Sequence, residues 1–302
     1  MSDAADHYLQ AARRASTQRR YAQAIEHFEA EWGGMLPASS ESVVRYLAAY
    51  GATASASTLR THLAALAQWH QQHGFVDPTK APRVRDTLRG IQALHPRPVK
   101  QAEALQLQAL EDCIGGLQVQ LGATEPGVGL RAARDQALIL LGFWRALRGD
   151  ELCRLQAEYV QIREGEGIQL FLPSSKTDRA NRGRNLTMPA LKRLCPVQAC
   201  AQWLEVSGVD QGPLFRAIDR WGHVSEQALN ANSVSRLLRQ ALLRSGVDAE
   251  GYSAHSLRRG FATWASRNQW SSKELMAYVG WRDVQTAARY IDGDAPFGEW
   301  VR

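Results

Sequence analysis

The stretch YSAHSLRRGF at residues 252–261 decides the fold around it, because it predicts a helix with two chemically different faces. Ser253 is a favourable N-cap residue. At about 100° per residue, the apolar residues share one face, whereas His255, Arg258 and Arg259 gather on the other. Such a polar face near a helix N-terminus suits a phosphodiester, since arginine binds non-bridging oxygens and histidine exchanges a proton. A solvated polar face is the alternative.

A second segment, ALRGDEL at residues 146–152, places Arg148 at the end of an apolar helix. An arginine there must reach solvent or meet an anion, because an unpaired buried charge is costly. Glu151, three residues on, is a candidate partner. A local Arg–Glu pair at a helix end is therefore the alternative to a functional role.

Two aromatic residues near the end of the sequence complete the pattern. Trp281 stands in VGWRD (279–283), and Tyr290 follows it by nine residues in ARYI (288–291). On one continuous helix, nine residues would put the two rings on opposite sides. They can share a site only if Trp281 precedes the helix, with Asp283 as its cap. A tyrosine becomes a candidate nucleophile where phosphate-binding groups surround it.

The first 95 residues predict four or five short helices with polar caps and no strand pattern. Ser16 and Thr17, Ser39 and Ser40, and Ser57 are the expected starts of the first three helices. This part should form a small helical bundle. The segment HPRPVKQ at 95–101 has two prolines within three residues, which predicts an interdomain linker or else a tight surface loop.

The second part begins with an amphipathic helix at 104–117 and a helix at 135–147 that is apolar on all sides, hence buried and central. Residues 159–163 and 168–172 flank Gly-Glu-Gly and predict a hairpin, and residues 184–188 predict a third strand. From Val197 onward the pattern is helical. The sequence thus predicts a mainly α fold with one small antiparallel sheet.

Composition excludes several classes of protein. Of 302 residues, 45% are hydrophobic and 22% charged, values that exclude intrinsic disorder and fibrous repeats. No run approaches the ~18 apolar residues of a membrane span, and the start lacks the apolar region of a secretory signal. The four cysteines include one C-x₄-C pair without a histidine cluster, which predicts free thiols and no metal site.

The net charge of +6 is concentrated in one stretch. Between residues 174 and 193, six basic residues accompany the single acid Asp178, an excess of five positive charges. Lys176 lies there, between the second and third predicted strands. The clustering favours phosphate contact over a merely solvated loop.

Together these segments resemble the signature of the tyrosine recombinases, or phage integrases: Arg, Lys, His-x-x-Arg, His or Trp, Tyr. The matching residues, in order along nearly the whole chain, are Arg148, Lys176, His255, Arg258, Trp281 and Tyr290. Trp281 stands where the family more often has histidine, and in this it resembles the Cre-like members, which have tryptophan there. Ala146 replaces the usual glycine two residues before the first arginine, which leaves Arg145 as a rival to Arg148.

The resemblance implies the DNA breaking-rejoining enzyme fold: a helical core-binding domain that clamps DNA (1–95), a linker (96–102) and a catalytic domain (103–302). It implies site-specific strand exchange through a 3′-phosphotyrosyl intermediate, without metal, ATP or another cofactor. Tyr290 would attack, two arginines would hold the phosphate, Lys176 would protonate the leaving oxygen, and His255 would serve as acid and base. Trp281 would donate its indole N–H to the phosphate, and Glu151 would orient the first arginine or His255.

The resemblance also implies partners. They are double-stranded DNA with inverted repeats and further copies of the chain, which is monomeric when free and tetrameric on two sites. The expected location is the cytoplasm, as a bacterial or phage-encoded protein associated with the nucleoid and not with a membrane. A type IB topoisomerase and a non-catalytic DNA-binding protein are the alternatives on the same fold. Further DNA contacts are expected from Arg60, Arg83, Arg85, Arg179, Arg182, Asn232, Ser235 and Arg236.

Overall fold

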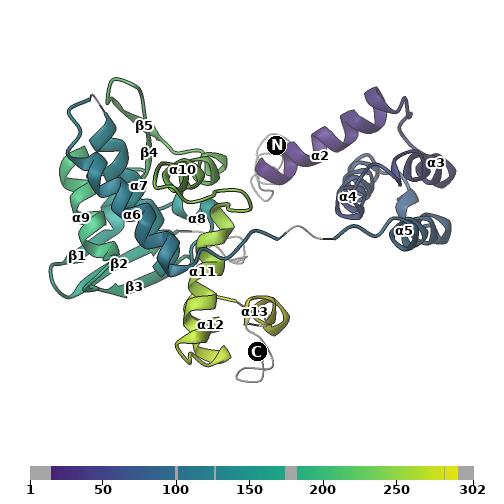
Figure 1. Cartoon of the computed structure of the whole chain (residues 1–302). Helices are drawn as coiled ribbons and strands as arrows, with labels where there is room; N and C mark the ends of the chain where they lie inside the picture. Colours follow the sequence, from purple (N-terminus) through teal and green to yellow (C-terminus); the bar gives the residue numbers. More distant parts are fainter. Residues whose placement is uncertain (1–14, 99–100, 126, 174–181, 282, 292–302) are drawn as a thin grey trace. The chain divides into compact units, whose positions relative to one another are not determined.

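The chain divides into two compact units, Met1–Lys100 and Gln101–Arg302 (Figure 1). The computed structural model describes residues 15–98, 101–125, 127–173, 182–281 and 283–291. Within the last helix, the side chains of Thr286, Arg289, Tyr290 and Ile291 fall outside that description. In the described residues, no helix is both long enough and apolar enough to cross a membrane.

The first unit is a helical bundle, as the sequence predicts. Its helices are α2 (Ala15–Glu26), which runs into a π-helical turn (His27–Glu31), α3 (Ser40–Tyr50), α4 (Ala56–Gln72) and α5 (Pro82–Leu94), with a 3₁₀ turn at Pro78–Lys80. Ser39 caps α3 by accepting a hydrogen bond from the Ser42 N–H at 3.1 Å. The cap of α4 is Ser55 instead of the expected Ser57, because the Ser55 hydroxyl accepts from the Thr58 N–H at 3.0 Å.

In the second unit, α7 (Val128–Trp144) is the central helix. It packs against α6 (Leu107–Leu121), α9 (Pro196–Ser207) and α11 (Ala254–Arg267). Every residue from Ala132 to Phe143 is buried, which confirms the prediction of a central helix. The helix ends earlier than the expected Leu147, because the chain turns at Ala146, whose φ is 52°. The remaining helices are α8 (Gly149–Leu152), α10 (Ala231–Arg244), α12 (Ser272–Val279) and α13 (Val284–Ile291).

The predicted hairpin and third strand form a three-stranded antiparallel sheet. Its strands are β1 (Val160–Arg163), β2 (Gly167–Leu172) and β3 (Arg184–Pro189), in the order β1-β2-β3. The register sets Ile162 opposite Ile168 and Leu170 opposite Leu186. Gly165 has a φ of 72° in the β1–β2 turn, a conformation that favours glycine.

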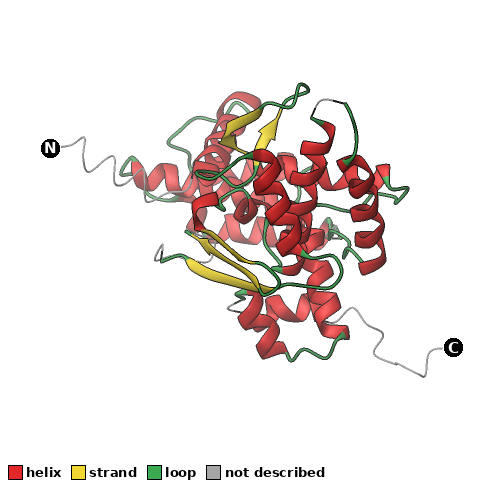
Figure 2. Ribbon diagram, turned by 90° about the vertical axis from the view of Figure 1, so that its left-hand side faces the viewer, coloured by secondary structure: helices red, strands yellow, loops and turns green. Residues whose placement is uncertain are grey.

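A second, two-stranded sheet contradicts the expectation that the chain is helical from Val197 to its end. The strands β4 (Arg216–Ile218) and β5 (Val224–Ala228) pair antiparallel. Figures 1 and 2 show them on a different side of the unit from the larger sheet. The sequence hid them because each is short and half-buried at most, so neither carries an alternating apolar pattern.

Candidate active site

Arg148 and Glu151 form an ion pair within the site. Arg148 is the N-cap residue of α8, and its backbone N–H donates to the Glu151 carboxylate at 2.9 Å. Its guanidinium donates to the same carboxylate at 2.8 Å. The Glu151 side chain is only 2% exposed, whereas that of Arg148 is 23% exposed. Glu151 therefore fixes the orientation of an arginine that still reaches solvent.

Arg258 joins this pair from α11. Its Nη1 donates to the Ala146 carbonyl oxygen at 2.7 Å and lies 3.9 Å from a Glu151 oxygen. The periodicity placed Arg258 with His255 on the polar face of the helix. In the structure, however, the Arg258 side chain is only 1% exposed. The reason is that the Ala146 carbonyl, Glu151 and the Trp281 ring surround its guanidinium.

Trp281 closes the other side of the Arg258 guanidinium. The Arg258 Cζ lies 5.2 Å from the centroid of the Trp281 ring, within the range of a cation–π contact. Trp281 is buried in the connection between α12 and α13. The Asp283 carboxylate accepts from the Gln285 N–H at 3.1 Å at the start of α13. The structure thus confirms that Trp281 precedes the tyrosine-bearing helix and that Asp283 caps it.

The positions of the proposed nucleophile and lysine follow from the chain path. Tyr290 is in the last turn of α13, and α13 packs against α11 and α12. Helical geometry puts the backbone of residue 290 on the same side of α13 as Ala287, which is 1% exposed. Lys176 belongs to the connection between β2 and β3 and, like Arg179, lies outside the described residues.

His255 lies in the first turn of α11, whose N-cap is Ser253. The Ser253 hydroxyl accepts from the His255 N–H at 3.2 Å, which confirms the predicted cap. Partial removal from water, followed by the positive charges of Arg258, Arg148 and Arg259, lowers the pKa of His255 below its ordinary 6.5. Glu151 opposes the shift. The imidazole is consequently neutral at pH 7, the form that accepts a proton.

The rival first arginine, Arg145, is engaged elsewhere. Its guanidinium donates to the Tyr278 carbonyl oxygen and lies 4.0 Å over the Tyr278 ring on α12. The residue is 6% exposed, and burial lowers the pKa of Arg145 to about 10. These contacts favour Arg148 as the phosphate-binding residue and make Arg145 a link between α7 and α12.

Arg184, the first residue of β3, is a member of this cluster that the sequence analysis did not single out. Burial lowers its pKa, Glu151 raises it and Arg148 lowers it. Arg184 also lowers the pKa of Arg145. The sequence signal was weak because Arg184 is one of six basic residues in a single stretch.

The charge balance of the site favours an anion. Four guanidinium groups, those of Arg145, Arg148, Arg184 and Arg258, interact with the one buried carboxylate of Glu151. One carboxylate cannot neutralise four guanidinium groups. A half-buried cationic cluster of this kind binds phosphate with charge-assisted hydrogen bonds.

In the first unit, the structure brings two of the three expected DNA-contact residues together. Exposed Arg60 of α4 and Arg85 of α5 line one cavity of about 570 Å³, together with Arg89. Arg83 points elsewhere, since its guanidinium donates to Glu41 of α3 at 2.8 Å. Arg60 and Arg85 therefore form one basic surface, and Arg83 is separate from it.

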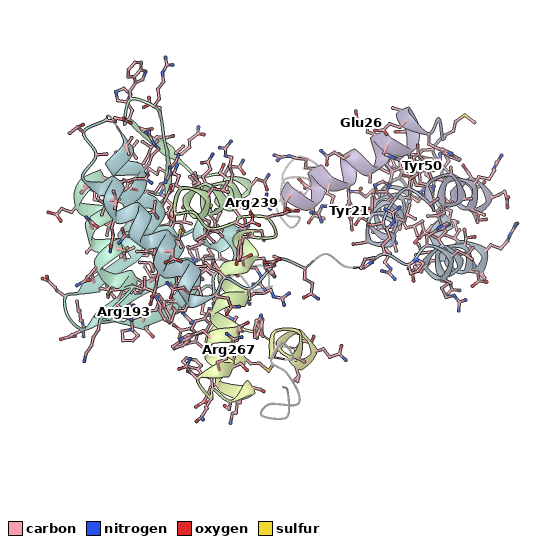
Figure 3. The ribbon with its side chains drawn as sticks, viewed as in Figure 1. Tyr21, Glu26, Tyr50, Arg193, Arg239 and Arg267 are labelled. Carbon is pink, nitrogen blue, oxygen red and sulfur yellow. The ribbon has the colours of Figure 1, made fainter. Side chains whose placement is uncertain are left out.

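In the second unit, the expected DNA-contact residues of α10 have different settings. Asn232 and Arg236 are exposed. Ser235 accepts a hydrogen bond from the Ala254 N–H at 3.0 Å, so it supports the start of α11. Exposed Arg239 follows Arg236 by one turn of α10 and donates to the Tyr252 carbonyl oxygen at 2.6 Å (Figure 3). Arg182 is exposed before β3.

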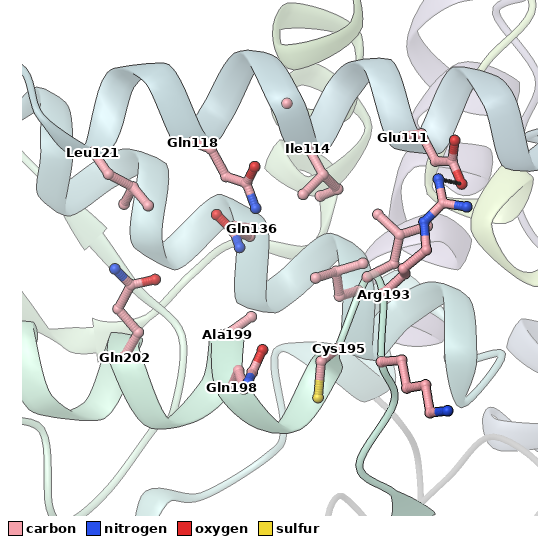
Figure 4. A pocket seen from close by; sticks show the side chains of 14 residues that line it. Glu111, Ile114, Gln118, Leu121, Gln136, Arg193, Cys195, Gln198, Ala199 and Gln202 are labelled. Atoms are coloured by element: carbon pink, nitrogen blue, oxygen red, sulfur yellow. Dashed lines mark hydrogen bonds and ion pairs between the residues drawn. The ribbon is translucent and has the colours of Figure 1, made fainter.

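A separate cavity of about 460 Å³ lies among α6, α7 and α9 (Figure 4). It is lined by Gln118, Gln136, Gln198 and Gln202, and a Glu111–Arg193 ion pair of 2.8 Å borders it. None of the predicted catalytic residues lines it. The described residues contain no group of histidine, cysteine or acidic side chains able to hold a metal.

Comparisons with known proteins agree with this geometry. Residues 122–295, which are 174 of the 302, match the model of the phage integrase family. The chain is 29% identical over 262 residues to an integrase/recombinase xerD homolog of Selenomonas ruminantium, covering 85% of this chain and 74% of the relative. It is 25% identical over 283 residues to recombinase cre of Escherichia phage P1, covering 88% and 80%.

Solved structures show the same fold at low sequence identity. A lambda integrase (75–356) dimer bound to a COC′ core site matches with a TM-score of 0.62 and 17% identity, covering 98% of this chain and 96% of that chain. A XerH site-specific recombinase bound to a palindromic difH substrate matches with a TM-score of 0.62 and 15% identity, covering 91% and 76%. With more than half of its length matching the family model, the chain belongs to the phage integrase family and is a site-specific tyrosine recombinase, an enzyme that exchanges DNA strands by phosphoryl transfer.

Proposed function

We propose that Arg148, Lys176, His255, Arg258, Trp281 and Tyr290 are the catalytic residues of this recombinase, with Glu151 as a positioning residue. The observation that carries the proposal is the pairing of Arg148 and Arg258 with the buried Glu151 carboxylate, with the Trp281 ring against Arg258 and beside the helix that bears Tyr290. Three separate parts of the chain meet there: residues 148–151, α11, and the α12–α13 connection.

The reaction balances without a metal or an external energy source. The Tyr290 oxygen forms a bond to the scissile phosphorus as the bond from phosphorus to the 5′ oxygen breaks. The tyrosine proton passes to neutral His255, and Lys176 gives a proton to the departing 5′ oxygen. Arg148 and Arg258 stabilise the negative charge of the pentavalent transition state, and the Trp281 indole N–H donates to the same phosphate. The 3′-phosphotyrosyl bond conserves the energy needed for religation.

The two units have different proposed roles. The helical unit, residues 1–95, clamps DNA through the Arg60–Arg85 surface, residues 96–102 link the units, and residues 103–302 form the catalytic domain. Further DNA contacts come from Arg83, Arg179, Arg182, Asn232, Ser235 and Arg236. Ser235 also supports the start of α11. The partner is double-stranded DNA with inverted repeats. The chain is monomeric when free and forms a tetramer on two sites, in the cytoplasm. Solved DNA-bound dimers and tetramers of lambda integrase support this assembly.

The decisive test concerns Tyr290. Covalent capture of random-sequence duplexes with the unmodified protein identifies a cleavage site. A duplex that carries this site and a nick beside it is the substrate, because the cleaved strand escapes from it and the covalent adduct stays trapped. Tyr290→Phe should bind this substrate normally and form no covalent adduct, because only the hydroxyl is lost. Tyr278→Phe is a matched control, since the Tyr278 hydroxyl donates to the Trp144 carbonyl at 2.9 Å within the same unit. It should still form the adduct.

The same substrates separate the alternatives. An adduct formed by Tyr290→Phe would refute the assignment of the nucleophile. Binding of the random-sequence duplexes by the unmodified protein, with no duplex captured covalently, would favour the non-catalytic DNA-binding protein. Adduct formation and supercoil relaxation without exchange between two sites would favour the type IB topoisomerase.

A further inference from the structure

Arg184 lies against the turn that leads to Trp281. A Cβ atom added at Gly280 would lie 3.0 Å from the Arg184 Cζ and closer still to its Nη1. Gly280 ends α12 with a φ of 76°, a conformation that also favours glycine. The glycine therefore leaves the space that the Arg184 guanidinium occupies, and β3 meets the end of α12 at this point.

The electrostatic neighbours of Arg184 are those of the active site. Arg148 and Glu151 both influence its charge, and Arg184 in turn influences Arg145. Arg184 is half-buried, so part of its side chain remains accessible to a ligand.

Arg184 differs from the other arginines in its contacts. Arg148 donates to Glu151, Arg258 to the Ala146 carbonyl, and Arg145 to the Tyr278 carbonyl. Within the described part of the chain, no hydrogen bond or ion pair engages the Arg184 guanidinium. A guanidinium has five N–H donors, and burial without partners is unfavourable for them. The described residues therefore leave the Arg184 guanidinium available to bind an anion.

We propose that Arg184 is a third phosphate-binding residue of the active site, which donates to a non-bridging oxygen of the scissile phosphate beside Arg148 and Arg258. The proposal rests on the proposed function of the cluster. Two non-bridging oxygens gain negative charge as Tyr290 attacks, and a third guanidinium aimed at them stabilises the transition state more than the ground state. It also gives Gly280 a function, because any larger residue there would displace Arg184.

The test compares Arg184→Gln and Arg184→Lys with the unmodified protein on the nicked substrate. Arg163→Gln is the matched control, because exposed Arg163 lies on β1, at the other edge of the same sheet. Arg184→Gln should slow single-turnover cleavage by about 10²-fold. Binding in a gel shift and the far-ultraviolet circular dichroism should be unchanged. Arg184→Lys, which keeps the charge but loses the planar fork, should fall between the two. Arg163→Gln should cleave normally.

A second substrate separates phosphate binding from a structural role. Replacing one non-bridging oxygen of the scissile phosphate by methyl removes the negative charge that Arg184 is proposed to neutralise. On this methylphosphonate, Arg184→Gln and the unmodified protein should cleave at similar rates. The same defect on both substrates, or no defect on ordinary DNA, would overturn the proposal. If the unmodified protein formed no covalent adduct at all, the proposed catalytic function would fail instead.

Discussion

Ala146 and Glu151 show how single residues build the recombinase site. Ala146 adopts a φ of 52°, which is unfavourable for a residue with a side chain. The turn it makes presents its carbonyl oxygen to Arg258 and brings Arg148 to the start of α8. Glu151 then pairs with Arg148, and a buried carboxylate is tolerated only with such partners. Strained backbone and buried charge thus meet where the chemistry is proposed to occur.

The two neighbouring arginines should respond differently to lysine. Arg148→Lys should reduce cleavage by about 10²-fold or more, because an ammonium cannot bind two phosphate oxygens at once, and should hardly change the melting temperature. Arg145→Lys should cleave nearly normally but lose about 1–2 kcal/mol of unfolding free energy, since it weakens the contacts with Tyr278. Thermal melts and cleavage assays on both variants check this. The opposite ranking would make Arg145 the first catalytic arginine.

His255 gives the reaction a defined pH dependence. Its pKa is lowered, so the imidazole stays neutral down to a pH below its ordinary 6.5. The cleavage rate should therefore be level from pH 7.5 to 6.5 and should fall only below that range, as protonation removes the proton acceptor. His255→Gln should be slow, without this acidic limb. A rate that already declines above pH 6.5 would contradict the role.

The lowered pKa of His255 also affects folding. The unfolded chain binds a proton at His255 at a higher pH than the folded chain does. The contribution of His255 to stability is thus present above pH 6.5 and is lost as the pH falls below it. Stability should be recorded alongside the rates, so that acid unfolding is not mistaken for titration of the proton acceptor.

At the scale of helices and strands, local signals predicted the caps and the larger sheet. Ser39, Ser253 and Asp283 each accept the hydrogen bond expected of a cap. Burial was harder to predict, because helical periodicity describes one helix and cannot show what covers it. Arg258 is buried because Ala146, Glu151 and Trp281, all distant from it in sequence, surround its guanidinium. Arg184 lies against the end of α12 and interacts electrostatically with Arg148 and Glu151, which are all far away in sequence.

Lys176, in the connection between β2 and β3, is the proposed proton donor to the leaving 5′ oxygen. A 5′-bridging sulfur makes the leaving group a thiolate, which departs without a proton. Lys176→Ala should therefore cleave the sulfur-containing substrate far better than ordinary DNA, when each rate is compared with that of the unmodified protein. Equal defects on both substrates would contradict the role of proton donor and direct attention to Arg179 or Arg182.

At the scale of the whole molecule, the two units have separate hydrophobic cores. Phe28, Leu47 and Leu66 belong to the core of the first unit, and Leu138 and Phe261 to that of the second. Each unit therefore has its own packing to stabilise it, and the segment between them has only to connect them. About seven extended residues span roughly 23 Å, which is comparable with the diameter of a duplex. Binding on opposite sides of DNA is thus compatible with the length of the linker.

The last prediction concerns assembly on DNA and the segment PFGEWVR at residues 296–302, which lies outside the described residues. Its apolar residues Phe297, Trp300 and Val301 favour docking on a neighbouring protomer over folding back on their own domain. Sedimentation of the free protein should then give a monomer of 33.5 kDa. Deleting 296–302 should spare binding to one inverted repeat and weaken cooperative binding to the second, because only the second event gains the contact between protomers. A gel-shift titration with unchanged cooperativity would show that the segment serves its own domain instead.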